Sequence, residues 1–120
     1  MTAPDAVDLA ALAAELLEKA ATTHARRASR TLAHPVDGLR QTVIALLADA
    51  DLGEHESPGP ASLQVLRGQV RIVAGNGSAP LRAGQIAPIP MQRHGLHADE
   101  KAAQQVARTL GRRPETRDWR

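Results

Sequence analysis

Two histidines, His55 and His94, are the residues of this chain whose type and setting could do chemistry. An imidazole can bind a metal ion, and its ordinary pKa near neutrality suits a general acid or base. The chain has no cysteine, so any metal site would need nitrogen or oxygen ligands. Three readings are therefore open: a reduced metal site, an acid–base pair, and two buried, hydrogen-bonded rings with a structural role only.

The other histidines, His24, His34 and His97, are expected to lie outside any site. Strand alternation would turn His97 to the face opposite His94. Other polar residues on strands near a pocket could bind an acidic ligand, or only cover apolar neighbours with their stems. These are Arg40, Gln41 and Arg93.

The middle of the chain, from about Leu39 to Ala98, is predicted to be all β. Asn76-Gly77 predicts a tight hairpin, because both residues tolerate the positive φ that such a turn requires. Pro88 and Pro90 suit a strand edge or end, since neither has an amide donor. Closely spaced strands with such turns indicate a sandwich or barrel. The predicted strand segments are Thr42–Leu47, Leu63–Leu66, Val70–Val73 and Ile86–Ile89.

The segment before this region is predicted to hold a helix, from about Asp8 to Ala21. Its leucines and alanines recur at a one-sided helical spacing, and Asp5 or Asp8 could cap it. A basic stretch follows, which is either a phosphate-facing cluster or a solvated strand edge. Its arginines are Arg26, Arg27 and Arg30.

The end of the chain is open to two interpretations. The apolar residues of Lys101–Leu110 are spaced for a helix, and Gly111 could stop it. Either a closing strand is then lost, or its surroundings impose strand structure on a helix-like sequence. A lost strand would leave an open sheet edge, which predicts a homodimer. The basic tail beyond Gly111 is expected to be loosely docked or disordered.

Two stretches resemble a known family. Asp49–Gly68 resembles the first conserved motif of the cupin superfamily, and Gly84–Ala98 resembles the second. In the first stretch His55 matches the first histidine of the motif. Ser57 stands in place of its second histidine, and Ala61 stands in place of its glutamate.

In the second stretch, Gly84 and Pro90 keep the motif spacing, and His94 matches its histidine after a one-residue deletion. The resemblance implies a small, bacterial, RmlC-like cupin β-barrel (jelly roll), mainly β, with an N-terminal α-helix and a possible C-terminal helix. On this division residues 1–22 form the helix, 23–100 the barrel, and 101–120 the C-terminal helix or strand with the basic tail.

The same resemblance implies a divalent first-row metal (Fe, Mn, Ni or Zn) whose remaining ligands are His55 and His94. Such a site would be weak, because cupins ordinarily use three histidines and a carboxylate. Strand alternation turns Glu56 away from His55, unless Pro58 to Pro60 distorts the strand, and it turns Gln64 away from Ala61, so neither is an obvious replacement ligand.

Composition limits the partners. With 120 residues the chain suits one domain. Phe and Tyr are absent and the net charge is only +2, which disfavours nucleic acid as a partner. The run Val43–Ala48 is too short to span a membrane, and the first residues lack the basic start of an export signal, so a cytoplasmic location is expected.

Three functions remain open at this point. The first is a metal-free module that binds a small organic ligand in the barrel. The second is a metal-dependent enzyme, of dioxygenase or isomerase type, that uses His55 and His94. The third is an assembly role in which the dimer face is the functional surface. The sequence does not decide whether the protein is an enzyme.

Overall fold

A computed structural model describes residues 6–33, 38–56 and 59–109 of the chain. Its one described helix, α1 (Leu9–Ala20), begins after Asp8, whose carboxylate accepts a hydrogen bond from the Ala11 amide at 3.1 Å. An aspartate at this position satisfies an amide that has no partner within the helix. The predicted helix and its Asp8 cap are confirmed. The buried face consists of Leu12, Ala13, Leu16, Leu17 and Ala20.

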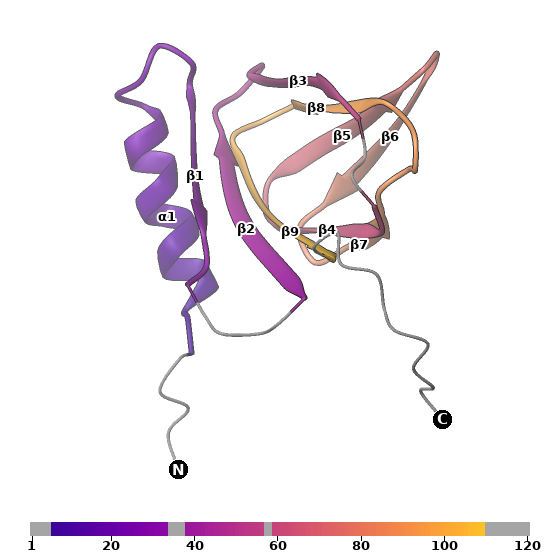
Figure 1. The fold of residues 1–120 in the computed structure, drawn as a ribbon. Coiled ribbons are helices and arrows are strands. Elements are labelled where there is room, and N and C mark those ends of the chain that lie inside the picture. Colours follow the sequence, from indigo (N-terminus) through magenta and orange to yellow (C-terminus); the bar gives the residue numbers. More distant parts are fainter. Residues whose placement is uncertain (1–5, 34–37, 57–58, 110–120) are drawn as a thin grey trace.

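The described strands form two antiparallel sheets (Figure 1). One sheet has the order β1-β2-β9-β4-β7 and the other the order β3-β8-β5-β6. The mainly β prediction is therefore confirmed, as a two-sheet jelly roll. Within the described ranges no strand pairing joins the sheets into a closed barrel. The strands are β1 (Arg27–Thr31), β2 (Leu39–Leu46), β3 (Asp51–His55), β4 (Ala61–Arg67), β5 (Gln69–Ala74), β6 (Gly77–Arg82), β7 (Ile86–Pro88), β8 (His94–Ala98) and β9 (Ala102–Thr109).

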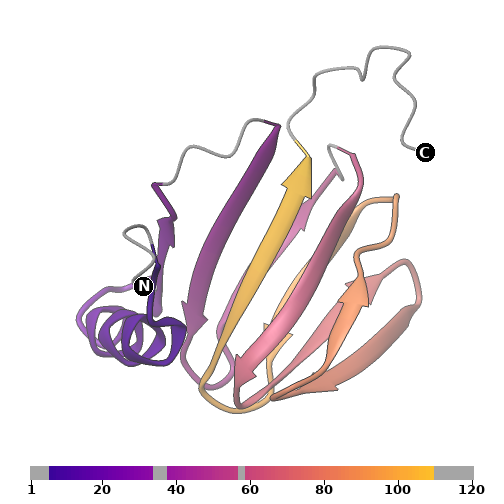
Figure 2. The same ribbon diagram turned by 90° about the horizontal axis from the view of Figure 1, so that it is seen from below.

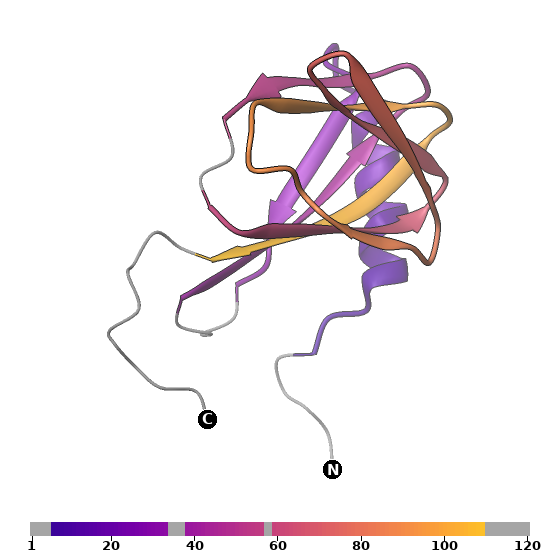
Figure 3. The same ribbon diagram turned by 90° about the vertical axis from the view of Figure 1, so that its right-hand side faces the viewer.

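The first sheet is covered on both faces. One face packs on the second sheet, and α1 packs on the other, beside β1 and β2 (Figure 2). In Figure 3, which looks from the side of β5 and β6, α1 lies behind both sheets. This explains the continuous apolar run in β2, because Val43 and Ala45 face the helix while Ile44 and Leu46 face the second sheet. No helix among the described residues has the length and apolar character needed to cross a membrane.

The segment Ala102–Thr109 is a strand, so the helical alternative for Lys101–Leu110 is wrong. β9 lies between β2 and β4 and pairs with both (Figure 2). Its residues also fit a strand pattern, since Ala102 and Val106 face the second sheet while Ala103 is buried on the other side. Pairing on both edges outweighs the local helical preference. The closing strand is therefore present, and its surroundings impose its conformation.

The predicted hairpin at Asn76-Gly77 is present, but its turn lies one residue earlier. Ala74 pairs with Gly77, so Gly75 and Asn76 form the loop. Gly75 takes the positive φ of 59°, at the first loop position, where a type II′ turn favours glycine. β7 is an edge strand that ends at Pro88, as predicted.

The basic stretch leads into an edge strand, which favours the solvated strand edge over the phosphate-facing cluster. Each of its arginines has a partner within the protein. Arg30 pairs with the Glu15 carboxylate of α1 at 2.5 Å, and Arg26 donates to the Ala48 carbonyl at 2.8 Å. Arg27 donates to a backbone carbonyl at 3.2 Å. The stretch therefore fastens the helix and a neighbouring loop to the first sheet.

Candidate functional site

A cavity of about 340 Å³ lies between the two sheets. Its size is at the small end of the range for ligand pockets, roughly 300–1,000 Å³. Its walls are mostly aliphatic, and its polar groups come from both sheets and from the end of β3. It is lined by Thr42, Ile44, Leu52, His55, Glu56, Ala61, Leu63, Ile72, Ile89, His94, Leu96, Val106 and Arg108.

A β-bulge in β3 brings His55 to this cavity. Leu52 pairs with Leu96 and His55 pairs with His94. Between these two pairs β3 has one residue more than β8. The extra residue places Leu52 and His55 on the same side of the strand, and both line the cavity. Uniform alternation would have placed them on opposite faces.

Gly95, on β8 opposite the bulge, allows the two strands to approach. A Cβ atom at this position would lie 2.9 Å from the Leu52 carbonyl oxygen and 3.4 Å from the Glu54 amide nitrogen. Backbone atoms cannot move aside as a flexible side chain can. The bulge and Gly95 therefore form one unit that sets the position of His55 beside His94.

The two histidine rings are neighbours, with centroids 4.7 Å apart and planes inclined by 56°. His94 is 4% exposed, whereas His55 is exposed. His94 Nδ1 lies 2.9 Å from the Gln92 carbonyl, and His55 Nδ1 lies 3.0 Å from the Gly53 carbonyl. A carbonyl only accepts, so in the neutral rings the proton sits on Nδ1. Each Nε2 is then left with a lone pair for a ligand.

The donor set does not fit a metal held in the ordinary cupin manner. Among the residues that the structure describes, no three His, Cys, Asp or Glu side chains are placed to hold an ion. Ala61, at the glutamate position of the motif, lines the cavity without a donor. Ser57 lies outside the described residues. The assignment of a metal to His55 and His94 stays a prediction.

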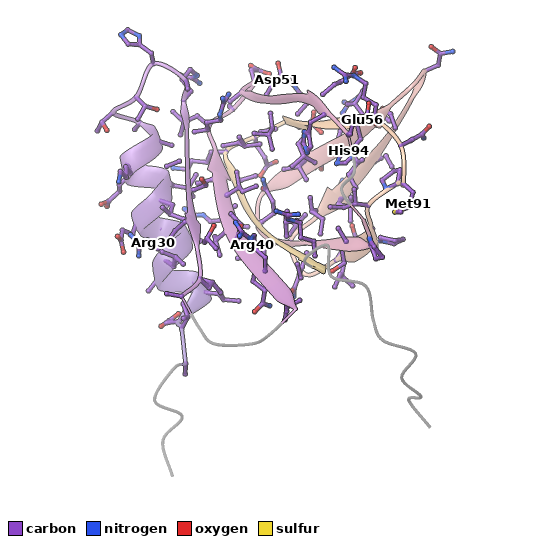
Figure 4. All side chains as sticks on the ribbon, in the orientation of Figure 1. Arg30, Arg40, Asp51, Glu56, Met91 and His94 are labelled. Carbon is purple, nitrogen blue, oxygen red and sulfur yellow. The ribbon has the colours of Figure 1, made fainter. Side chains whose placement is uncertain are left out.

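Glu56 lines the cavity, so the prediction that it points away is wrong. β3 ends at His55, and strand alternation does not extend past that end. One carboxylate oxygen of Glu56 lies 3.5 Å from Arg93, which also pairs with Glu54 at 3.2 Å. Figure 4 shows Glu56 and His94 on the side of the molecule formed by β3 and β8.

His97 faces the outer side of its sheet, as predicted. Its Nδ1 lies 2.6 Å from the Asp51 carboxylate, and this hydrogen bond raises the pKa of His97. The nearby Asp99 accepts from Gln69 at 2.8 Å and from Arg71 at 3.0 Å, which lowers the pKa of Asp99. These contacts tie β3, β5 and β8 together away from the cavity.

The other residues considered in the sequence analysis either lie away from the cavity or fall outside the described residues. Gln41 lies away from the cavity and donates to the Gln105 amide oxygen at 2.7 Å. Gln64 accepts from the same Gln105 at 3.5 Å, so it too points away, as predicted. His24 is exposed in the turn after α1, and His34 lies outside the described residues.

Sequence reasoning missed two residues of β9. Arg108 lines the cavity, on the wall that belongs to the first sheet. Gln104 is fully buried, and among the described residues neither polar atom of its amide has a hydrogen-bond partner. Gln104 pairs with Ile44 and Val65 and lies two residues before Val106 along β9. A strand interpretation of this segment would have placed both side chains on the inner face.

Comparison with known proteins identifies the fold. No family model and no curated protein matches the chain. A conserved protein of unknown function from Streptococcus pyogenes is 25% identical, with a TM-score of 0.67 over 97% of this chain and 93% of that one. A cupin superfamily protein from Desulfitobacterium hafniense is 15% identical, with a TM-score of 0.63 over 70% and 77%.

A salicylate 1,2-dioxygenase from Pseudaminobacter salicylatoxidans is also 15% identical, with a TM-score of 0.70 over 82% of this chain and 33% of that one. Several of the similar structures are described as cupin, cupin-2 or RmlC-like proteins. The chain therefore has the fold of a small cupin superfamily protein, as its two motifs implied. Identities this low carry the fold and not the chemistry.

Proposed function

We propose that this protein binds a small organic ligand in the cavity between its sheets, with a weak or absent metal site. The observation that carries the proposal is the cavity of about 340 Å³, with aliphatic walls and two histidine Nε2 atoms available on one side. Apolar walls with a few placed polar groups are typical of small-ligand sites. Neighbours of the same fold include a dioxygenase, so a cupin fold can serve small-molecule chemistry.

Thermal unfolding with a library of small organic ligands, with and without a chelator, tests this proposal. We expect ligands that raise the melting temperature, because binding to the folded state alone stabilises it, and we expect the chelator to leave the shift unchanged. His55→Ala should reduce the shift, because His55 lines the cavity.

His24→Ala is the matched control, since His24 is exposed in a turn and does not line the cavity. A library without any stabilising ligand would contradict the proposal. So would ligands that stabilise His55→Ala and the unaltered protein equally.

A second candidate, a metal-dependent small-molecule enzyme, is favoured by one observation. The rings of His55 and His94 lie 4.7 Å apart with both Nε2 atoms free of protein partners among the described residues. Two such donors could hold an ion weakly, with water completing its coordination. Elemental analysis of protein purified without an affinity tag separates the candidates. Near-stoichiometric Fe, Mn, Ni or Zn that is lost in His55→Ala would favour the enzyme.

A further inference from the structure

The cavity wall opposite the two histidines carries positive charge. Arg108 of β9 lines the cavity, and its direct partner on β2 is Arg40. Arg40 shares the alternation of Thr42, which lines the cavity, so both arginines belong to the inner face of the first sheet. Figure 4 shows Arg40 on β2. On its other side Arg108 pairs with Ala61, whose small side chain leaves room at this level.

Neither guanidinium has a partner among the residues that the structure describes. Within residues 6–33, 38–56 and 59–109, no hydrogen bond or ion pair involves the side chain of Arg40 or Arg108. Arg30, Arg71 and Arg93 each pair with a carboxylate. Like charges directly opposite each other on one sheet face destabilise the pairing of their strands. An anion bound between Arg40 and Arg108 would remove this repulsion.

The surroundings restrict the kind of anion. Glu56 lines the same cavity, and although Arg93 pairs with its carboxylate, a second negative charge on the ligand would be less favourable there. Behind Arg108 the wall is aliphatic, with Val106, Ile44 and Leu63. A planar guanidinium matches a carboxylate through two parallel hydrogen bonds. The combination favours one carboxylate on an apolar body.

We infer that the ligand of this cavity is a small monocarboxylate, whose carboxylate is bound by Arg108 with support from Arg40 and whose apolar part lies against Ile44, Leu63 and Val106. The inference rests on the proposed ligand-binding function and gives the chemical class of the ligand. Arg108 forms part of the cavity wall, whereas Arg40 is exposed, so Arg108 carries the larger share of the binding.

Calorimetric titration with hexanoate, hexan-1-ol and hexylamine tests the inference, because these probes share an alkyl chain and differ in their head group. We expect hexanoate to bind at least about tenfold more tightly than hexan-1-ol, and more tightly than hexylamine. Raising the salt concentration should weaken hexanoate and leave hexan-1-ol unchanged, since salt screens only the charged head.

Substitutions of single arginines test which of them binds the carboxylate of the ligand. Arg108→Gln should weaken hexanoate roughly tenfold and leave hexan-1-ol unchanged. Arg108→Lys should fall between, because an ammonium keeps the charge without the two parallel bonds. Arg40→Gln should cost about two- to fivefold. Arg82→Gln is the matched control, since Arg82 is an exposed β6 arginine that does not line the cavity. Circular dichroism confirms that each variant is folded.

Two results would overturn the inference and leave cavity binding intact: equal affinity for hexanoate and hexan-1-ol, or undiminished hexanoate binding by Arg108→Gln and Arg108→Lys. Stabilisation by neutral library ligands without any binding of hexanoate would also overturn it. If neither the three probes nor the ligand library bind, the proposed function itself fails, and the inference fails with it.

Discussion

His55 and His94 are held in place by backbone contacts on the same side of each ring. In both rings Nδ1 lies beside a carbonyl oxygen, so Nδ1 carries the proton of the neutral ring and Nε2 carries the free lone pair. A ligand that meets these atoms must offer a hydrogen-bond donor or a cation. Arg108, on the opposite wall, instead requires an acceptor. A ligand that contacts both walls would therefore carry an acceptor at the end near Arg108 and a donor at the end near the histidines.

Gln104 is the residue with the clearest cost to stability. Both of its polar atoms are buried without a partner in the part of the chain that the structure describes, and an unsatisfied buried amide costs about 1–3 kcal/mol. We expect Gln104→Leu, which has a similar volume and no polar atoms, to raise the free energy of unfolding by about 1–2 kcal/mol. Urea denaturation of the ligand-free protein measures this change.

Gln105→Leu is the control for Gln104→Leu, because the neighbouring Gln105 amide is hydrogen-bonded to both Gln41 and Gln64. Removing that amide should lower stability. A lower stability of Gln104→Leu would show that the buried amide has a partner, such as an ordered water. Since Gln104 does not line the cavity, ligand binding should be unaffected.

At the scale of single residues, part of the site could be predicted from the sequence. The family motifs pointed to His55 and His94, and the structure places them side by side. Glu56 was assigned to the wrong side because alternation was applied beyond the end of β3. Arg108 was missed because its segment reads as a helix until the pairing with β2 and β4 is known.

At the scale of elements, local signals predicted α1 and several strands, whereas long-range pairing decided the rest. The cap at Asp8 and the leucine spacing are contained within the helix, and the structure agrees. β9 depends on partners far away in the chain. The irregular register between β3 and β8 has no residue type that marks it. Such features follow from tertiary contacts and not from propensity.

The turn between β4 and β5 has no room for a side chain at Gly68. Gly68 has a φ of +79°, and a Cβ there would lie 2.2 Å from the Lys101 carbonyl oxygen. Gly84 has a φ of +92°, with no atom within 4 Å of a Cβ. We expect Gly84→Ala to cost about 1–2 kcal/mol of stability, from the backbone alone.

Gly68→Ala should cost at least about 2 kcal/mol more than Gly84→Ala, because the added methyl also displaces the backbone at the start of β9. Chemical denaturation of the two variants in parallel gives the difference. Equal losses would mean that the loop before β9 yields easily, and that crowding at Gly68 does not limit the fold.

At the scale of the whole molecule, the homodimer remains a proposal. The sequence argument for it invoked a missing closing strand, but β9 fills that position. The unpaired sides of β1 and β7, the edge strands of the first sheet, keep the proposal open. We expect light scattering at micromolar concentration to give twice the 12.7 kDa mass of one chain. A monomer mass would contradict the dimer.

The bulge between Leu52 and His55 has a consequence for evolution. Deleting one residue between Leu52 and His55 would turn one of these two side chains out of the cavity. The sequence would still contain both residues. The geometry of the site thus depends on the number of residues in β3 as well as on their identity. A relative whose sequence aligns with a gap at Gly53 or Glu54 would share the residue types of this site but not their arrangement.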